Sequence, residues 1–109
     1  MPTDRTELKA LLERLFNAFE EERWEEYPEL LTDDVVGHEN GKEIRGLEKQ
    51  LEFEQEYKRS DPDAAVAVEE MATSGNTVFS RGVAPGGGTH LLCAHVEDGK
   101  IAEFWVLTE

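Results

Sequence analysis

The chain has 109 residues, which is enough for one domain around one hydrophobic core and too few for two. Its 25 acidic residues outnumber its 11 basic ones, for a formal net charge of −14. A polyanion repels phosphate groups and anionic lipids, so we expect it to bind neither nucleic acid nor membranes. With a single cysteine, Cys93, no run of about 18 apolar residues and no basic-then-apolar leader, the sequence predicts a cytoplasmic protein.

The first predicted element is an amphipathic helix that begins at Asp4. Asp4 with Glu7 three residues later resembles a capping box, and apolar residues then recur at steps of three and four. These apolar positions are Leu8, Leu11, Leu12, Leu15, Phe16 and Phe19. A shorter second helix is predicted over 24–31, with Pro28 in its first turn, where a missing N–H costs little.

The rest of the chain is predicted to be mostly strands. A short strand is expected over 35–39, and a third helix from 46 to about 58, whose weak apolar stripe leaves most of its surface wet. Four more strands are predicted at 64–72, 77–84, 89–97 and 100–108. Helices first and antiparallel strands after them predict a single α+β domain over residues 1–109, with the helices packed on one face of the sheet.

The last two predicted strands form a hairpin, because Asp98-Gly99 between them is a strong two-residue turn signal. Unbroken pairing outward from this turn puts two sets of side chains on opposite faces of the sheet. The predicted inner face, nearly free of charge, carries Leu91, Cys93, His95, Ala102, Phe104 and Val106. The predicted outer face carries His90, Leu92, Ala94, Val96, Ile101, Glu103, Trp105 and Leu107. Because this second face is too apolar for open water, we expect a homodimer that packs it around Leu92, Trp105 and Leu107.

Two local strings carry a resemblance to a known family. The first is Asp33-Asp34-Val35-Val36, followed by Glu39 and Arg45-Gly46; the second is Asp98-Gly99-Lys100-Ile101, followed by Glu103 and Trp105. With the element order, they make nearly the whole chain resemble the nuclear transport factor two-like superfamily, and within it the SnoaL-like polyketide cyclases and ketosteroid isomerases. The resemblance implies a cystatin-like α+β cone, in which N-terminal helices pack in a strongly curved mixed or antiparallel sheet that encloses an apolar pocket. It also implies frequent dimerisation through the outer face of the sheet.

The resemblance carries over only part of the isomerase site. The catalytic base of the isomerases lies where this chain has Glu39, so a carboxylate is kept with one more methylene. Their two enolate-stabilising donors lie at places that look like Leu15 and Leu91, and losing even one such donor typically costs about 10²–10³ in rate. Steroid isomerisation is therefore not expected. The pocket positions carry over as apolar residues: Phe19, Leu31, Phe53, Cys93, Phe104 and Val106.

Glu39 and His95 are the candidate catalytic residues. A carboxylate facing an apolar cavity has a raised pKa and can act as a base near neutral pH, although Glu39 could instead end its strand in water. The hairpin pairing puts His95 on the inner face, where it could assist, or at the rim of the cone close to the turn. The predicted ligand-binding residues are Leu15, Phe19, Leu31, Phe53, Leu91, Cys93, Phe104 and Val106.

Other polar residues are predicted to lie away from the pocket. His38 and His90 should point outward, and since no histidine pair has the spacing of a zinc site, we predict neither a metal nor a cofactor. Arg81 is favoured to point outward into an interface salt bridge, with an inward anion anchor as the alternative.

Two functions of different classes remain open at this level. One is a small acid/base enzyme of isomerase, cyclase or hydrolase type, in which Glu39 moves a proton of a compact apolar carbonyl or epoxide-type substrate and His95 assists. The other is a non-catalytic ligand-binding or dimer-forming module that keeps the cone without the chemistry. The missing isomerase donors favour the second; the carboxylate at the base position favours the first.

Overall fold

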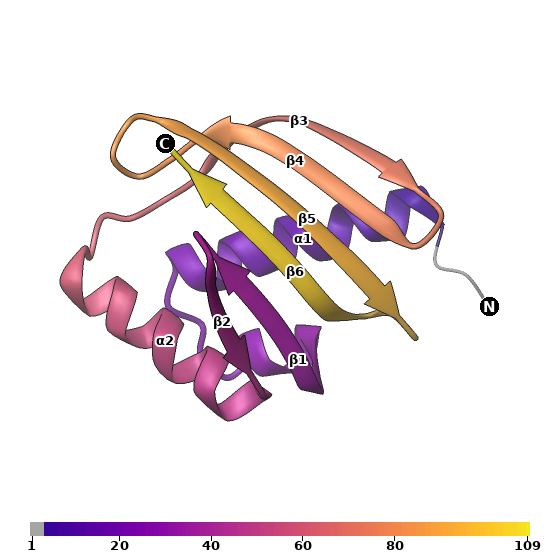
Figure 1. Cartoon of the computed structure of the whole chain (residues 1–109), viewed down its shortest axis with the longest axis horizontal. Coiled ribbons are helices and arrows are strands. Elements are labelled where there is room, and N and C mark those ends of the chain that lie inside the picture. The colour runs from indigo at the N-terminus through magenta and orange to yellow at the C-terminus, as the bar shows by residue number, and fades with distance from the viewer. Residues whose placement is uncertain (1–3) are drawn as a thin grey trace.

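The computed structural model describes residues 4–109, which form two helices, a short 3₁₀ helix and one six-stranded sheet. In chain order the elements are α1 (Arg5–Glu20), η1 (Tyr27–Leu30), β1 (Leu31–Glu39), β2 (Lys42–Arg45), α2 (Leu47–Ser60), β3 (Ala67–Ser74), β4 (Thr77–Val83), β5 (Thr89–Glu97) and β6 (Lys100–Thr108). The strands lie in the order β2-β1-β6-β5-β4-β3 (Figure 1). Only β1 and β6 run parallel among these neighbours, so the sheet is mixed.

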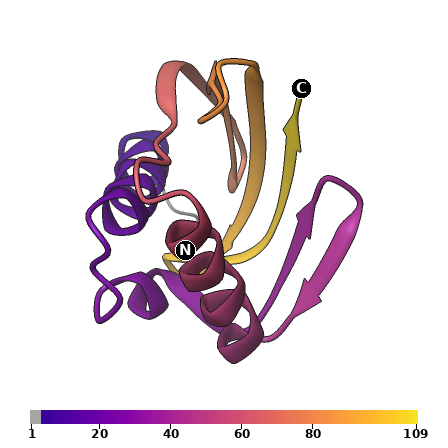
Figure 2. The ribbon, with the colours of Figure 1, turned by 90° about the vertical axis from the view of Figure 1, so that its left-hand side faces the viewer.

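The sheet curves around the helices, which all lie on its concave side (Figure 2). This arrangement confirms the predicted α+β cone with helices packed on one face of the sheet. The predicted helices and strands all occur, with ends shifted by a few residues, and the second helix is the single 3₁₀ turn η1 with Pro28 in its first turn. The short strand β2 was not predicted; it pairs with β1 through a turn in which Asn40 and Gly41 both have positive φ.

The N-terminal helix forms as its sequence predicts. The Asp4 carboxylate accepts hydrogen bonds from the backbone N–H groups of Thr6, at 2.8 Å, and Glu7, at 3.0 Å, which satisfies two of the free donors at the helix start. The apolar stripe of α1 then packs into the concave face of the sheet, and its buried residues are Leu8, Leu11, Leu12, Leu15 and Ala18. This helix therefore forms one wall of the interior, opposite the sheet.

The hairpin of β5 and β6 differs from the prediction by one β-bulge. The pairs Glu97 with Lys100 and Val96 with Ile101 form as predicted, but the next pair is His95 with Glu103, which leaves Ala102 as an extra residue in β6. A slip of one residue moves side chains to the opposite face. The bulge lets β5 and β6 bury their aliphatic residues together, so the inner face carries His90, Leu92, Ala94, Val96, Ile101, Phe104 and Val106.

The predicted face of β5 was therefore wrong along its whole length. Leu91, Cys93 and His95 lie on the outer face, while His90 and Leu92 are buried on the inner one. Residues of β6 beyond the bulge lie where they were predicted, with Phe104 and Val106 inside and Trp105 and Leu107 outside. The cavity wall thus contains His90, which the sequence analysis placed outside, and lacks His95, which it placed inside.

Candidate active site

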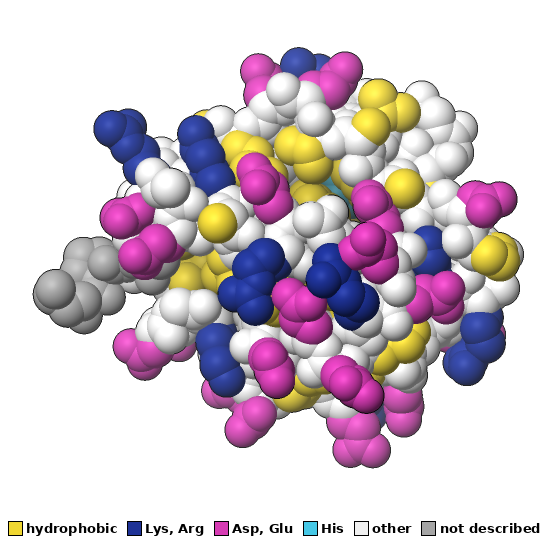
Figure 3. Space-filling model, turned by 180° about the vertical axis from the view of Figure 1, so that it is seen from behind, with side chains coloured by type: hydrophobic (Ala, Val, Ile, Leu, Met, Phe, Trp, Pro, Cys, Tyr) yellow, Lys and Arg dark blue, Asp and Glu magenta, His cyan; other side chains and the backbone are white. Residues whose placement is uncertain are grey.

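A cavity of about 100 Å³ lies between α1, α2 and the concave face of the sheet. Its walls are mostly aromatic and aliphatic, and its polar groups come from the ends of β1, β5 and β6, from η1 and from α2. The lining residues are Leu15, Phe16, Phe19, Tyr27, Glu39, Asn40, Glu54, Tyr57, Val66, Pro85, His90, Leu92, Phe104, Val106 and Thr108. Figure 3 looks onto the helical side and shows a hollow framed by hydrophobic side chains, with histidine at its floor and charged groups around it. An apolar cavity with a few converging polar groups is the usual form of a small-molecule site.

Two glutamates meet inside this cavity. Glu39 is the last residue of β1, beside Val106 of the parallel strand β6, and Glu54 lies on the inward side of α2. The side-chain amide of Gln50, which is fully buried, donates to Glu39 Oε2 and to Glu54 Oε1, each at 3.0 Å. Gln50 therefore holds the two carboxyl groups together.

Gly37 makes room for this arrangement. A Cβ atom at position 37 would overlap Oε1 of Gln50 and would lie 2.7 Å from the ring of Phe104. Because Gly37 has no side chain, the Gln50 oxygen can turn toward the strand, away from both carboxylates, while its N–H groups point at them. The glycine of β1 thus leaves the space in which the Gln50 amide packs against the strand.

Burial sets the protonation of the glutamate pair. Desolvation raises the pKa of Glu39, and hydrogen bonds from Gln50 and Glu54 and the charge of Lys42 partly oppose it. The pKa of Glu54 is raised well above its usual value, first by burial and then by the charge of Glu39 and the hydrogen bond between the two carboxyls. Burial therefore favours one retained proton, shared by Glu39 and Glu54, at a pH where exposed glutamates are ionised.

The remaining polar walls are neutral. Burial, followed by the charges of Glu54 and Glu39, raises the pKa of Tyr27 well above its usual value, so its phenol stays protonated. His90 is 6% exposed, its ring packs edge-on against Phe16 with centroids 5.9 Å apart, and burial lowers its pKa. None of the lining residues is Lys or Arg. Among the lining residues, the carboxyl pair is therefore the one source of formal charge; the buried Lys58 ammonium, which is not among them, lies 5.3 Å from the centroid of the Phe19 ring.

Two side-chain hydrogen bonds hold the segment at the mouth of the cavity between α2 and β3. The buried ammonium group of Lys58 donates to the carbonyl oxygen of Ala64 at 2.9 Å, and the backbone N–H of Val66 donates to Glu20 Oε1 at 3.1 Å. These contacts fasten Val66, which lines the mouth, to both helices. Tyr57 lies beside it with 42% of its surface exposed, and its ring packs against Phe19.

The sequence profile of a known family, the SnoaL-like domain, matches residues 12–104. The chain belongs to the SnoaL-like domain family. A search of curated proteins finds no match.

Solved structures share the whole fold of this SnoaL-like domain. A SnoaL-like protein of unknown function from Burkholderia thailandensis superposes with a TM-score of 0.88 at 14% identity, covering 99% of both chains. Wild-type IdmH from Streptomyces antibioticus, a proposed polyketide cyclase, gives 0.78 at 24% identity, covering 94% of this chain and 91% of its own. A proposed ketosteroid isomerase from Kribbella flavida gives 0.79 at 23% identity, covering 98% and 81%. At these identities the likeness shows the fold.

The structure brings five of the predicted site residues together at the cavity. Glu39, Leu15, Phe19, Phe104 and Val106 all line it. The other predicted residues lie elsewhere: Leu31 in the core, Phe53 outside on α2 under the Lys42 ammonium, and Leu91, Cys93 and His95 on the outer face of the sheet.

His95 was predicted on the inner face and lies on the outer one because of the bulge at Ala102. Its Nε2 lies 3.6 Å from the exposed Glu97 carboxylate, so it cannot assist Glu39.

Among the polar residues of the site, the sequence analysis missed Gln50 and Glu54 and placed His90 on the wrong face. A signal for two of them was present in α2. Its inward stripe contains Leu47 and Leu51, and Gln50 and Glu54 lie on the same stripe at helical spacing. Polar residues on the buried stripe of a helix indicate a site, and here they mark the carboxyl pair.

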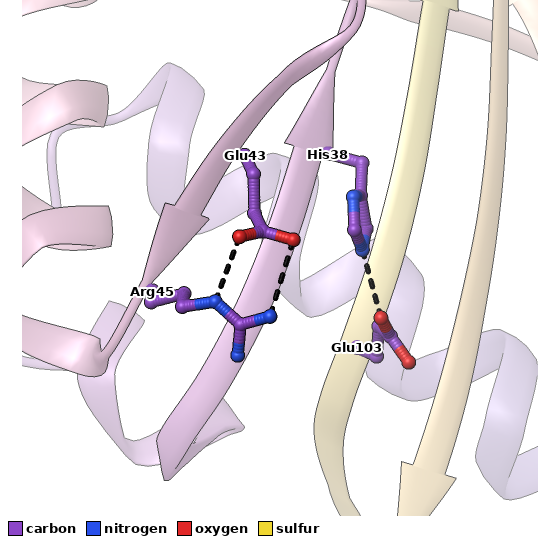
Figure 4. A network of polar contacts seen from close by, with 4 residues as sticks. All are labelled: His38, Glu43, Arg45 and Glu103. Carbon is purple, nitrogen blue, oxygen red and sulfur yellow. Dashed lines mark hydrogen bonds and ion pairs between the residues drawn. The ribbon is translucent and has the colours of Figure 1, made fainter.

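The outer face of the sheet carries exposed apolar residues between two groups of ion pairs. Phe79, Leu91, Trp105 and Leu107 are all at least 40% exposed and line one shallow groove. On one side, His38 stacks on Trp105 and its Nε2 lies 2.7 Å from Glu103, next to the pair of Arg45 with Glu43 (Figure 4). On the other side, Arg81 binds Glu70 at 2.8 Å and Glu69 at 3.2 Å.

The outward directions predicted for His38 and Arg81 are thus confirmed. Leu92, which was predicted on this outer face, is buried and belongs to the cavity wall, because of the same bulge. Within residues 4–109, no group of three or more His, Cys, Asp or Glu side chains is placed to hold a metal ion, and none of the helices is long and apolar enough to cross a membrane.

Proposed function

We propose that this SnoaL-like domain binds a compact, mainly apolar carbonyl compound in the cavity, and that Glu39 takes a proton from the carbon next to the carbonyl group. One observation carries the proposal: two buried carboxyls, Glu39 and Glu54, are held together by Gln50 at an apolar cavity that no Lys or Arg lines, and burial raises the pKa of both. A desolvated carboxylate is a stronger base than one in water, which suits it to remove a weakly acidic proton.

The pair also accounts for the charge that moves during such a step. The C–H bond breaks, its proton goes to Glu39, and its electron pair forms the C=C bond of an enolate whose negative charge lies on the former carbonyl oxygen. Both glutamates are then protonated, so the pair has lost its charge and the Glu54 hydroxyl can donate to the new oxyanion. Charge moves between neighbouring groups inside the cavity, without reaching solvent.

Exchange of ligand protons with solvent deuterons tests this proposal. Cyclohexanone in D₂O should lose the NMR signal of the protons next to its carbonyl faster with the protein than without it. Glu39→Gln should lower the exchange rate by a factor of about 10²–10⁴, which is the usual contribution of a positioned base. The affinity for cyclohexanone should stay the same. Asp34→Asn, an exposed carboxylate on the same strand, is the matched control. Exchange by Glu39→Gln at the wild-type rate would show that Glu39 is not the base.

A non-catalytic ligand-binding module is the second candidate, and one observation favours it. The place that looks like the first isomerase donor holds Leu15, an apolar part of the cavity wall; Leu91, matched to the second donor, points away from the cavity, so the missing donor rests on Leu15 alone. In that case cyclohexanone should bind to the wild type, as measured by NMR titration, without any faster exchange.

A further inference from the structure

His90 is a buried polar group that proton transfer at Glu39 does not use. It is 6% exposed, its ring lines the cavity, and its Nδ1 is fully enclosed with no hydrogen-bond partner among the described residues. An enclosed polar atom without a partner costs stability, and such atoms are rare in folded proteins. No described residue bonds Nε2 either, and because Nδ1 has no surface open to the cavity, a ligand oxygen would bond the imidazole through Nε2, or through Nδ1 after the ring turns over.

The strand register places His90 well away from the carboxyl pair. Glu39 of β1 lies opposite Val106 of β6, and Val106 lies opposite Leu92 of β5. Two strand spacings, roughly 10 Å, therefore separate the backbone at Glu39 from β5, where His90 lies two residues beyond Leu92. The wall between the two polar ends is apolar, since it is made by Phe104, Val106 and Leu92.

We infer that the ligand carries a second polar group, a neutral hydroxyl or carbonyl oxygen, which hydrogen-bonds to the His90 imidazole while the reacting carbonyl lies at Glu39 and Glu54. This rests on the proposed function and adds the class of substrate: a compact hydroxyketone or diketone with an apolar body between its two oxygens. His90 then decides which ketones bind and how they are oriented.

The charge of the site favours a neutral oxygen as the second polar group of the ligand. A carboxylate or phosphate at His90 would lie in an apolar wall with no Lys or Arg lining the cavity to pair with it. An ammonium group would be drawn to the carboxyl pair at the opposite end, which would leave His90 without a partner. A neutral oxygen satisfies the imidazole as either donor or acceptor, with no buried charge.

Paired titrations of cyclohexanone and 4-hydroxycyclohexanone, followed by NMR, test the inference. The two ketones share the ring and the carbonyl and differ by one hydroxyl group. Wild-type protein should bind the hydroxyketone about fivefold more tightly, as one neutral hydrogen bond gives. His90→Phe and His90→Leu should bring the two affinities to within about twofold of each other, and His90→Gln, which keeps a polar side chain, should restore part of the preference.

His95→Phe on the outer face is the control variant and should keep the full preference. Equal affinities in wild-type protein, or a preference that persists in both apolar variants, would overturn the assignment of His90. Because cyclohexanone alone reports on the proposed function, the two failures are distinguishable. If neither ketone binds, the proposed function is wrong and the inference with it; if both bind equally, only the inference is wrong.

Discussion

Glu54 shows how a buried acid links the site to stability. Its pKa is raised in the folded protein, so the folded state holds this proton more tightly than the unfolded state does. Stability from such a group is complete below the unfolded pKa of about 4.3 and is lost as the pH rises through the folded pKa. The carboxyl pair should therefore destabilise the fold at high pH, as desolvated charges often do at functional sites.

Glu54→Gln should accordingly raise the free energy of unfolding at pH 8, because glutamine resembles the protonated acid and can still accept the hydrogen bond from Gln50. The difference from wild type should shrink as the pH falls toward about 4, where the native carboxyl is protonated in both states. Urea unfolding followed by tryptophan fluorescence across this pH range measures it. Glu52→Gln, exposed on the same helix, should show no such trend, and a Glu54→Gln protein less stable than wild type at pH 8 would refute the account.

At the level of single residues, the sequence could predict the first acid of the site and not the second. Glu39 ends a strand that a tight turn follows, and the family resemblance marks this place as one for a base. Glu54 lies in a helix that is rich in charge, and its place on the stripe of Leu47 and Leu51 was the one sequence signal that set it apart from the exposed glutamates around it. The sequence analysis placed His90 on the wrong face because a single bulge, at an alanine with no turn signal, reversed the predicted face of β5.

Among the elements, the contact of α2 with β1 positions the site. Gly37 is buried where Gln50 of α2 and Phe104 of β6 meet, and any side chain there would displace both. Gly37→Ala should therefore cost about 1–3 kcal/mol, as overpacking usually does. Urea unfolding gives the loss. The pH dependence of stability should become steeper, because the hydrogen bonds from Gln50 lower the pKa of both carboxyls and would be weakened as Gln50 moves away.

The matched control for this substitution is Gly86→Ala. Nothing lies within 4 Å of a Cβ atom built at Gly86, so this change should stay within about 0.5 kcal/mol of wild type. A Gly37→Ala protein as stable as wild type would mean that α2 can shift freely on the sheet, and that Gln50 does not depend on β1 for its position.

Periodicity predicted the elements better than their pairing. The stripe of α1 and the turn at Asp98-Gly99 are local signals, and the structure has the helix and both strands of that hairpin where these signals put them. β2 has four residues, of which only Ile44 is buried, so no alternation marks it. The parallel pairing of β1 with β6 joins segments far apart in the chain and was not predicted, since the resemblance implied only a mixed or antiparallel sheet.

At the scale of the whole molecule, the charge of −14 is spread unevenly. On the outer face of the sheet the carboxylates Glu43, Glu69, Glu70 and Glu103 all pair with Arg45, Arg81 or His38. An apolar groove lies between these pairs, with Trp105 and Leu107 exposed in it. We propose a second copy of the chain as the partner of this face, because two acidic molecules can meet there without bringing unpaired carboxylates together.

Light scattering tests the dimer directly. The wild type should have the mass of two chains, and because the two copies carry the same net charge, dissociation should be weaker at high salt than at low salt. Leu107 is 60% exposed in the groove, so Leu107→Glu would bury an unpaired charge in the dimer and should raise the dissociation constant at least about tenfold. Ala10→Glu, which adds the same charge on the exposed side of α1, should leave the mass unchanged. A wild-type monomer at both salt concentrations would contradict the proposed dimer and would mean that any partner of this apolar face is not a second copy of the chain.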